Sequence, residues 1–376
     1  MSRANKYFKL IFHITLLVFT SYFIKQNSVK TVIVHKITRY LSDIKHILLW
    51  TNVPGLEKEG QSHFVDGKCA HINCHITSNR SFLGDVRYFD AIIFNLQEVS
   101  DDYIELPKVR GPTQKYIFAA NDSADNYPVC NSVYEDFFNW TWSYRLDSTI
   151  QYRFFSFQNL FDMNMDNTHV WKQDMKPVDS SFKSILSSKH RAAAIFLDKC
   201  QTRSRRETFV QNLQTHLSVY NLTVDVFGAC GPFKCGRKSM NSCFQKLKNN
   251  YFFYLAFEDS ISPDFVSTAV MNGYQHNTVP IVYGGAPYRR YLPHHSYLNG
   301  LELGAKLLAK KMYEIIQHKE SYYDYFRWRN HYSIKTTTVL DPCGLCFTFN
   351  NPAWLLHKVS YVRFREWWHP YYVERC

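Results

Sequence analysis

The sequence predicts an α/β protein of two domains behind an N-terminal membrane anchor. A length of 376 residues suits about two domains. Short apolar runs alternate with segments of helical periodicity, which is typical of α/β folds. Hydrophobic residues make up 45% of the chain and aromatic residues 17%, enough for sizeable cores, and this excludes long-range disorder.

The first apolar run predicts the membrane anchor. Its sequence is YFKLIFHITLLVFTSYFI, and Arg3, Lys6 and Lys9 lie on its N-terminal side or within its first turn. The positive-inside rule then keeps the N-terminus cytoplasmic and the rest of the chain lumenal. A cleaved signal peptide is the competing interpretation, but no small-x-small cleavage site follows Ile24. The predicted order is a cytoplasmic tail, a transmembrane signal anchor and a stem, at residues 1–6, 7–24 and 25–45.

Cysteines and glycosylation sequons also favour a secretory compartment. The ten cysteines are expected to form disulfides there, and the pairing stays open. Half of a zinc site at Cys343 and Cys346 is the alternative, although no second ligand pair completes it. The disulfide candidates singled out are Cys69, Cys74, Cys230, Cys235, Cys243, Cys343 and Cys346. The sequons lie at Asn79, Asn121, Asn139 and Asn221.

The net charge of +12 does not indicate a nucleic-acid partner. Residues 1–50 hold eight Lys or Arg and one Asp, so +7 of the charge lies in the leader. Nucleic-acid proteins usually carry their basic patch on a folded domain. We therefore expect no nucleic-acid binding.

Buried strands are predicted wherever a short apolar run lies between turn residues. A polar stretch with Pro177 separates the two groups of strands and is expected to be the linker, near residues 170–190. A helix is expected over 264–276. The expected strands are 46–50, 91–96 and 115–120, then 192–197, 223–228, 251–258 and 279–283. The expected domains are 46–175 and 176–350, with a C-terminal segment at 351–376.

Polar residues cluster after the last two predicted strands, where parallel sheets bind ligands. Glu258, Asp259 and Ser260 end one strand abruptly, and Ser262 and Asp264 follow; helix capping explains Ser262 and Asp264 but does not require Glu258. Gly284 and Gly285 end the other strand and allow a close backbone approach to phosphate, although a plain turn would also use them. Six basic residues nearby could stabilise a diphosphate, although solvated surface charge explains most of them. They are Arg203, Arg205, Arg206, Lys234, Arg237 and Lys238.

Several motifs in their order and spacing resemble the α1,3-fucosyltransferases of glycosyltransferase family 10. FYLAFEDS (253–260), DFVS (264–267) and VPIVYGG (279–285) resemble the family signature FYLAFENS, DYVTEK and VPVVYGG. Further likenesses cover about residues 46–346. They are ILLWT (47–51), CHITSNRS (74–81), FNWTWSYRLDS (138–148), VDVFGACG (224–231), HSYLN (295–299) and CGLC (343–346).

The resemblance implies a Golgi enzyme of the type II membrane topology with a lumenal GT-B fold of two Rossmann-like domains. The first domain would take the acceptor and the second GDP-fucose. Such an enzyme transfers fucose, with inversion, to the 3-hydroxyl of N-acetylglucosamine (GlcNAc) on glycoprotein N-glycans. The resemblance implies no required cofactor and no protein-bound metal, although a divalent cation could stimulate. Core GlcNAc, antennal LacNAc and LacdiNAc all remain open as acceptors.

The resemblance also assigns site residues. Asp122 falls at the position of the family's candidate catalytic base, a Glu, and a glycan at the adjacent Asn121 is therefore not expected. Arg206 falls on the arginine that meets the donor diphosphate, and Glu258 on a glutamate that holds the fucose or orders the site. The residues expected to bind the donor are Arg206, Tyr254, Glu258, Ser260, Asp264, Ser267, Tyr283, Gly284 and Gly285.

Three positions depart from the family pattern. Thr268 and Ala269 stand where the family has a Glu for the donor ribose and a Lys for phosphate, and Asp259 adds a carboxylate that would repel phosphate if it faced the donor. Loss of a phosphate-binding cation could cost ~1.5–3 kcal/mol; Arg289, Arg290 or Lys238 could substitute for it. The alternative function is a catalytically inactive relative that binds glycans or assists other transferases, and a third is a transferase with another nucleotide sugar.

Overall fold

The computed structural model describes residues 44–101, 104–160, 170–337, 340–356 and 360–376. The predicted anchor at 7–24 lies outside these residues. Within the described part of the chain, no helix has both the length and the apolar character needed to cross a membrane.

The first domain is built on a parallel sheet of six strands in the order β2-β1-β3-β4-β5-β6. Apolar side chains on both faces of its central strands are buried, as in a sheet covered on both sides. The strands predicted at 46–50, 91–96 and 115–120 are confirmed as β1, β3 and β4. The six strands are β1 (Lys45–Leu49), β2 (Cys74–Thr77), β3 (Ala91–Asn95), β4 (Lys115–Ala120), β5 (Trp140–Ser143) and β6 (Ile150–Gln151).

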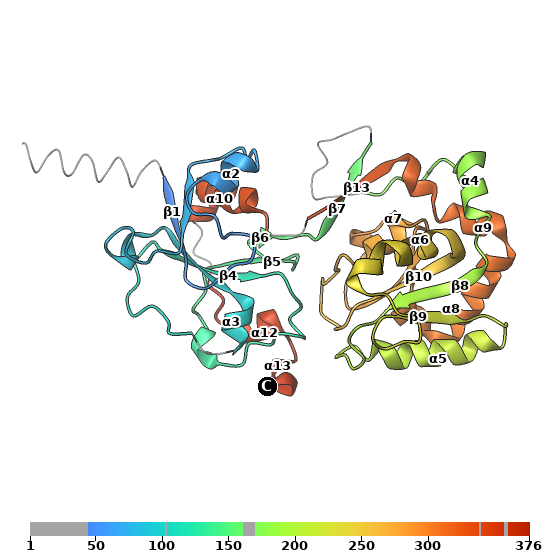
Figure 1. Cartoon of the computed structure of the whole chain (residues 1–376). Helices are drawn as coiled ribbons and strands as arrows, with labels where there is room; N and C mark the ends of the chain where they lie inside the picture. The colour runs from blue at the N-terminus through green and yellow to red at the C-terminus, as the bar shows by residue number, and fades with distance from the viewer. Residues whose placement is uncertain (1–43, 102–103, 161–169, 338–339, 357–359) are drawn as a thin grey trace, which may run out of the picture.

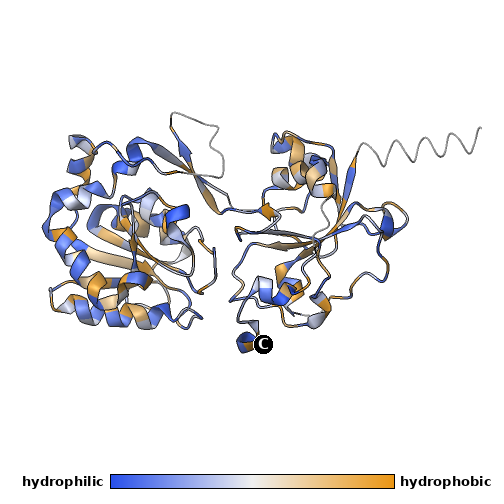
Figure 2. Ribbon diagram, turned by 180° about the vertical axis from the view of Figure 1, so that it is seen from behind, coloured by the Kyte–Doolittle hydropathy of each residue, from blue (hydrophilic) through white to orange (hydrophobic). Residues whose placement is uncertain are grey.

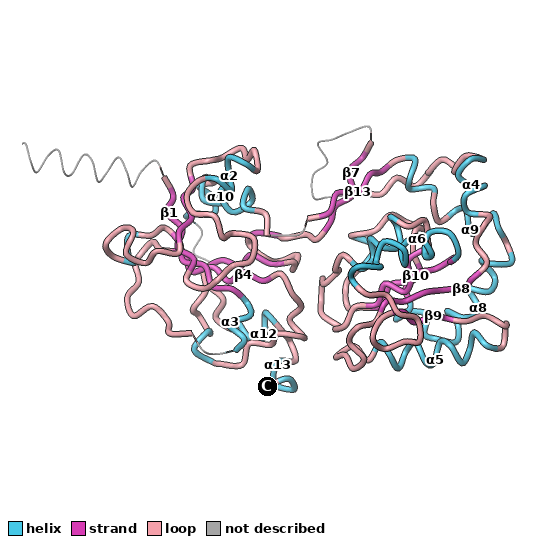
Figure 3. Tube along the Cα trace, viewed as in Figure 1, coloured by secondary structure: helices cyan, strands magenta, loops and turns pink. Residues whose placement is uncertain are grey.

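The second domain contains a five-stranded parallel sheet in the order β12-β11-β10-β8-β9. All four strands predicted in this half are confirmed. Helices surround the sheet (Figure 3). Figure 2 shows apolar residues concentrated on the strands, whereas hydrophilic and hydrophobic residues alternate along the outer helices. The strands are β8 (Arg191–Phe196), β9 (Val224–Phe227), β10 (Tyr251–Phe257), β11 (Val279–Tyr283) and β12 (Leu298–Asn299). The main helices are α4 (Ser180–Leu186), α5 (Arg206–Ser218), α6 (Met240–Asn250), α7 (Ala269–Gln275), α8 (Gly300–Gln317) and α9 (Lys319–Asp324).

The helix expected over 264–276 is shorter than predicted. Helix α7 begins only at Ala269, and Asp264 has a φ of 63°, outside the right-handed helical region. The residues before α7 instead contact the first domain, as described below. The prediction was therefore wrong for 264–268.

An antiparallel ribbon of two strands, β7 (Phe155–Asn159) and β13 (Tyr332–Thr336), lies between the two domains (Figure 1). The chain enters the second domain through β7 and leaves it through β13. After β13 it returns to the first domain, where Phe364 and Trp368 pack edge-on against Phe118 of β4. The returning helices are α10 (Pro342–Asn350), α11 (Pro352–Leu356), α12 (Phe364–Trp368) and α13 (Tyr372–Arg375), and α2 (Ser62–Asp66) and α3 (Leu96–Asp101) complete the domain.

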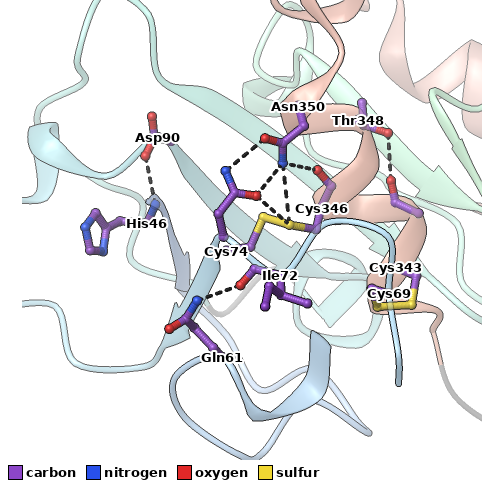
Figure 4. The surroundings of a disulfide bond; sticks show 12 residues. His46, Gln61, Cys69, Ile72, Cys74, Asp90, Cys343, Cys346, Thr348 and Asn350 are labelled. Carbon is purple, nitrogen blue, oxygen red and sulfur yellow. Dashed lines mark hydrogen bonds between the residues drawn. A yellow bond between two sulfur atoms is a disulfide. The ribbon is translucent and has the colours of Figure 1, made fainter. Parts of the chain in front are cut away.

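All ten cysteines form disulfides, so the zinc alternative at Cys343 and Cys346 is wrong. Two of the bonds fasten α10 to the first domain, one to the loop after α2 and one to β2 (Figure 4). Beside the bond to β2, Asn73 and Asn350 exchange a pair of amide hydrogen bonds of 2.9 Å. The pairs are Cys69–Cys343, Cys74–Cys346, Cys130–Cys376, Cys200–Cys230 and Cys235–Cys243.

The two α10 disulfides should stabilise the fold non-additively. Replacing Cys69 and Cys343 by Ala leaves Cys74–Cys346 in place and opens a ring of only about ten residues. Replacing all four cysteines opens a loop of about a hundred residues, because Cys130–Cys376 still closes it. The chain-entropy relation gives about 2–3 kcal/mol for the first loss and about twice that for the second. Chemical denaturation of the three proteins measures both steps; equal losses would contradict this account.

Candidate active site

Residues 258–265, here called the docking segment, leave the carboxyl end of β10 and contact the first domain. The Ser260 hydroxyl donates to the Ser123 hydroxyl at 2.6 Å, and both residues are fully buried. The Leu146 N–H donates to the Asp264 carboxylate at 3.1 Å. Figure 3 shows loops of the two domains facing each other here. The second sheet therefore presents its ligand-binding edge to the first domain.

Aromatic packing reinforces these hydrogen bonds. Phe265 is buried, and its ring meets Tyr144 edge-on at a centroid distance of 5.0 Å and Phe154 at 5.7 Å. Tyr144 is also buried, and its hydroxyl accepts a hydrogen bond from the Ala124 N–H. The Tyr144 side chain thus contacts both the docking segment, through Phe265, and the loop after β4, through Ala124.

Asp122 lies in the loop after β4, residues 121–126, here called the Asp122 loop. Its carboxylate accepts the Ser123 N–H at 2.6 Å. Burial raises the pKa of Asp122 above its usual range, and the nearby negative charge of Asp259 acts in the same direction. A carboxylate with a raised pKa is a better proton acceptor than a solvated one near neutral pH.

Asp259 does not stand as an uncompensated charge. Its carboxylate forms an ion pair with Lys199 at 2.8 Å and accepts the Asn126 side-chain amide at 2.8 Å. Burial raises the pKa of Asp259, but the Lys199 ammonium outweighs that effect and holds the pKa below its usual range. The additional carboxylate therefore joins the two domains, and the repulsion of a phosphate that it could cause is offset by Lys199.

Glu258 is buried at the end of β10, with 4% of its surface exposed. Its carboxyl accepts the Ser267 N–H at 2.9 Å. Burial raises its pKa to about 7. Glu258 therefore carries a proton for part of the time at neutral pH and can donate as well as accept a hydrogen bond.

The two glycines after β11 are needed for packing within the protein. A β-carbon on Gly284 would collide with the Tyr288 hydroxyl and lie 3.1 Å from Cγ of Glu258. One on Gly285 would lie 2.7 Å from the Ser262 carbonyl oxygen. Their expected contact with the donor stays a prediction, and the observed contacts already explain why glycine stands at both positions.

Arg206, the first residue of α5, lies beside the end of β10. Its guanidinium donates to the Phe257 carbonyl oxygen at 2.6 Å, and its Nε is buried with no hydrogen-bond partner among the described residues. A permanently charged fork with an unused donor suits an anion. The neighbouring loop is fixed to the docking segment, because the Ser204 hydroxyl donates to the Glu258 carbonyl oxygen at 2.7 Å.

The other residues expected at the donor site lie in well-packed positions. Tyr254 is buried among apolar side chains and accepts a weak 3.4 Å hydrogen bond from Asn272. Tyr283 packs against Phe209 and Phe257. Their roles toward a ligand stay predictions. Arg289 and Arg290 are exposed on a short 3₁₀ turn, and Lys238 is exposed after β9.

Ala269 is the first residue of α7, with Thr268 before it. The amides there are partly engaged already, because the Ser267 N–H donates to Glu258 and the Ala269 N–H to the Ser267 hydroxyl at 3.2 Å. Two amides at the start of this short helix are therefore already engaged within the protein.

A pocket of about 360 Å³ lies at the carboxyl end of β1 and β2, and sequence reasoning missed it. The residues that line it include those that follow β1 and β2, two neighbouring strands of the sheet. Arg80 stacks on Trp50 at 3.7 Å, and Glu59 accepts hydrogen bonds from Thr77 and Ser78. Arg80 belongs to the CHITSNRS likeness, so that motif held the signal. The lining residues include Trp50, Thr51, Asn52, Glu57, Glu59, Thr77, Ser78 and Arg80.

The predicted glycosylation sites differ in accessibility. Asn79 and Asn221 are exposed. Asn139 is partly buried, and its side-chain oxygen accepts the Tyr116 N–H at 3.0 Å. Glycosylation at all three stays a prediction.

Comparison with known proteins gives the family. The model described as fucosyltransferase, N-terminal, matches residues 42–155, and that described as glycosyltransferase family 10 (fucosyltransferase) C-term matches residues 186–367. The chain belongs to glycosyltransferase family 10, the fucosyltransferases. The family resemblance drawn from the motifs is thereby confirmed.

Two relatives come from Drosophila melanogaster. Alpha-(1,3)-fucosyltransferase C is 30% identical over 88% of this chain and 79% of its own length. Glycoprotein 3-alpha-L-fucosyltransferase A is 29% identical over 86% of this chain and 60% of its own length. A crystal structure of an alpha1,3-fucosyltransferase with GDP-fucose aligns with a TM-score of 0.48 at 12% identity, over 85% of this chain and 92% of that one.

The raised pKa of Glu258 predicts a pH dependence of stability. The folded protein binds a proton at Glu258 that the unfolded chain releases above about pH 4.5. The free energy of unfolding should therefore fall by about 3 kcal/mol as pH rises from about 4.5 to 7. Glu258→Gln should lack this component and be more stable than the parent protein at pH 8. Denaturation at pH 5 and pH 8 measures it, with the exposed Glu302→Gln as control; identical pH profiles for parent and Glu258→Gln would refute the assignment.

Proposed function

We propose that this chain transfers fucose from GDP-fucose, with inversion, to the 3-hydroxyl of GlcNAc on glycoprotein N-glycans. Family membership and the activities in the relatives' names support this function. The observation that carries it is the junction of the two domains. There the docking segment sets the Asp122 loop of the first domain against Glu258 at the end of β10, with Arg206 of α5 beside it.

In this mechanism Asp122 accepts the proton of the acceptor hydroxyl as its oxygen attacks the anomeric carbon of fucose. The bond from that carbon to the diphosphate breaks on the opposite face, and GDP departs with the bonding electrons. Arg206 stabilises the charge that develops on the diphosphate. Glu258, with a pKa near 7, exchanges a hydrogen bond with the sugar or with the groups that orient it.

The acceptor would extend from Asp122 along the carboxyl edge of the first sheet toward the pocket at β1 and β2. The Trp50 ring, the Arg80 guanidinium and the surrounding carboxylates and hydroxyls offer both an apolar surface and polar groups to a sugar. Such a combination is typical of small-ligand sites. The word glycoprotein in the name of one Drosophila relative supports a glycoprotein acceptor.

We place the enzyme in the Golgi membrane as a single-pass type II protein, anchored by residues 7–24, with its catalytic domains in the lumen. The basic residues before the apolar run support the orientation. Five disulfides and exposed sequon asparagines support an oxidising lumenal compartment. The proposed reaction requires no cofactor, and a divalent cation would at most stimulate it.

Asp122→Asn should abolish fucose transfer while it leaves GDP binding within a few-fold, because the amide keeps the shape of the side chain but cannot accept the proton. Asp122→Glu should retain transfer, and a faster rate would mean that the shorter native side chain is suboptimal. Transfer from GDP-fucose to an N-glycan and GDP titration measure the two effects. Near-normal turnover of Asp122→Asn would show that Asp122 is not the base.

Arg206→Ala should remove measurable GDP-fucose binding, whereas Ala269→Lys should strengthen it by restoring a cation at the start of α7. A charge-assisted contact of ~1.5–3 kcal/mol corresponds to about a 10- to 100-fold change in affinity. The exposed neighbour Arg203→Ala is the matched control and should leave affinity unchanged. If no variant binds at millimolar concentrations, Ala269→Lys included, the inactive-relative alternative is favoured.

A further inference from the structure

The Asp122 loop contains a second carboxylate, Asp125, that is almost completely buried. One per cent of its side chain is exposed. Arg375 forms an ion pair with it at 2.6 Å, and Nε2 of His369 lies 3.4 Å away. Both partners come from the last eight residues of the chain. A carboxylate buried this deeply stays charged only where such partners compensate it.

The other side of Asp125 faces the docking segment. Its own N–H donates to the Ser262 hydroxyl at 3.0 Å, and its carboxylate accepts a long 3.4 Å hydrogen bond from the Ile261 N–H. Burial opposes ionisation of Asp125, yet the His369 and Arg375 partners and the Ile261 amide together hold its pKa below the usual range. Asp125 therefore joins three segments: the Asp122 loop, the docking segment and the C-terminus.

The C-terminal residues are themselves anchored on the first domain. Cys376 is bonded to Cys130, four residues after the Asp122 loop ends. The Trp368 indole donates to the Tyr127 carbonyl oxygen at 2.9 Å, and Arg365 pairs with Glu135 at 2.7 Å. Residues 364–376, here called the C-terminal strap, thus lie along the segment that follows Asp122. Near the end of the strap, Arg375 contacts Asp125.

We infer that Arg375 is a positioning residue for the proposed transfer reaction. Through Asp125 it holds the Asp122 loop against the docking segment, so that Asp122 faces the donor site of the second domain. Without Arg375, Asp125 would keep His369, at 3.4 Å, as its partner from the strap. The loss of the closer partner favours protonation of Asp125 or its movement toward water, and either change would loosen its contacts with Ile261 and Ser262. This inference rests on the proposed function, because it assigns the strap a role in that reaction.

The effect of Arg375 should appear in turnover more than in donor binding. Asp122 lies three residues from Asp125, whereas Arg206, the candidate diphosphate contact, lies on α5 of the second domain. A displacement of a catalytic group by about 1 Å can cost about 100-fold in rate. Arg375→Ala should therefore lower kcat by about 10- to 100-fold and leave the Kd for GDP within about twofold. Arg375→Lys, which keeps the charge, should recover a large part of the loss.

The test uses the full chain purified in detergent, with Arg363→Ala as the matched control. Arg363 lies just before the strap and α12, and it forms an ion pair with Glu366 of that helix. This ion pair does not involve Asp125. Steady-state transfer gives kcat and KM, titration gives GDP affinity, and hydrogen exchange reports the amides of residues 121–126 and 258–265. Exchange in both segments should rise in Arg375→Ala and stay at the parent level in Arg363→Ala.

Three results would overturn the inference. The first is an unchanged kcat in Arg375→Ala, and the second is unchanged exchange in both segments. A loss of kcat in Arg363→Ala equal to that in Arg375→Ala would also overturn it, since general destabilisation of the C-terminus would then suffice. If the parent protein transfers no fucose, the proposed function fails and with it the role of Arg375 in turnover. Hydrogen exchange would then still decide whether Arg375 holds the two segments together.

Discussion

The site depends on one constraint: the hydrogen bonds and aromatic contacts by which residues 258–265 dock on the first domain. Each domain buries its own apolar core around a parallel sheet. The candidate base, however, lies on the first domain, and the candidate donor residues lie on the second. The contacts of residues 259–262, Asp264 and Phe265 bring these groups together. Because these hydrogen bonds are buried or partly buried, replacing one partner alone leaves the other unsatisfied, which favours a single arrangement of the domains.

The contacts at the domain junction explain what Asp259 and Ala269, two departures from the family pattern, do in this protein. Asp259 pairs with Lys199 and Asn126, so the added carboxylate strengthens the domain contact. Position 269 carries no cation, so Arg206 is left as the candidate anion contact at the end of β10. Its Nε has no hydrogen-bond partner among the described residues. The short helix α7 offers little in addition, since Glu258 already engages the amide of Ser267. In the proposed donor site, the positive charge therefore comes from Arg206 at the start of α5.

Much of the fold could be predicted from the sequence, because buried strands such as 115–120 and 279–283 are apolar runs between turn residues. The region 264–268 could not, since its helical pattern is overridden by contacts with residues distant in sequence. Nor could the pairing of Cys130 with Cys376, which depends on the return of the chain to the first domain. Motifs identified Asp122, Arg206 and Glu258 as candidates. They gave no sign of Lys199 or Arg375, whose roles depend on three-dimensional proximity to Asp259 and Asp125.

The central claim is that this junction forms a working GDP-fucose site despite the missing cation. The most direct measurement is titration of the full chain with GDP-fucose and GDP-mannose side by side, followed by transfer from each donor to an N-glycan. The account predicts saturable binding of GDP-fucose and transfer of fucose alone, since both donors share the nucleotide and differ only in the sugar that faces Glu258. Saturable binding of neither donor at millimolar concentrations, or binding of GDP-fucose with no transfer, would contradict it.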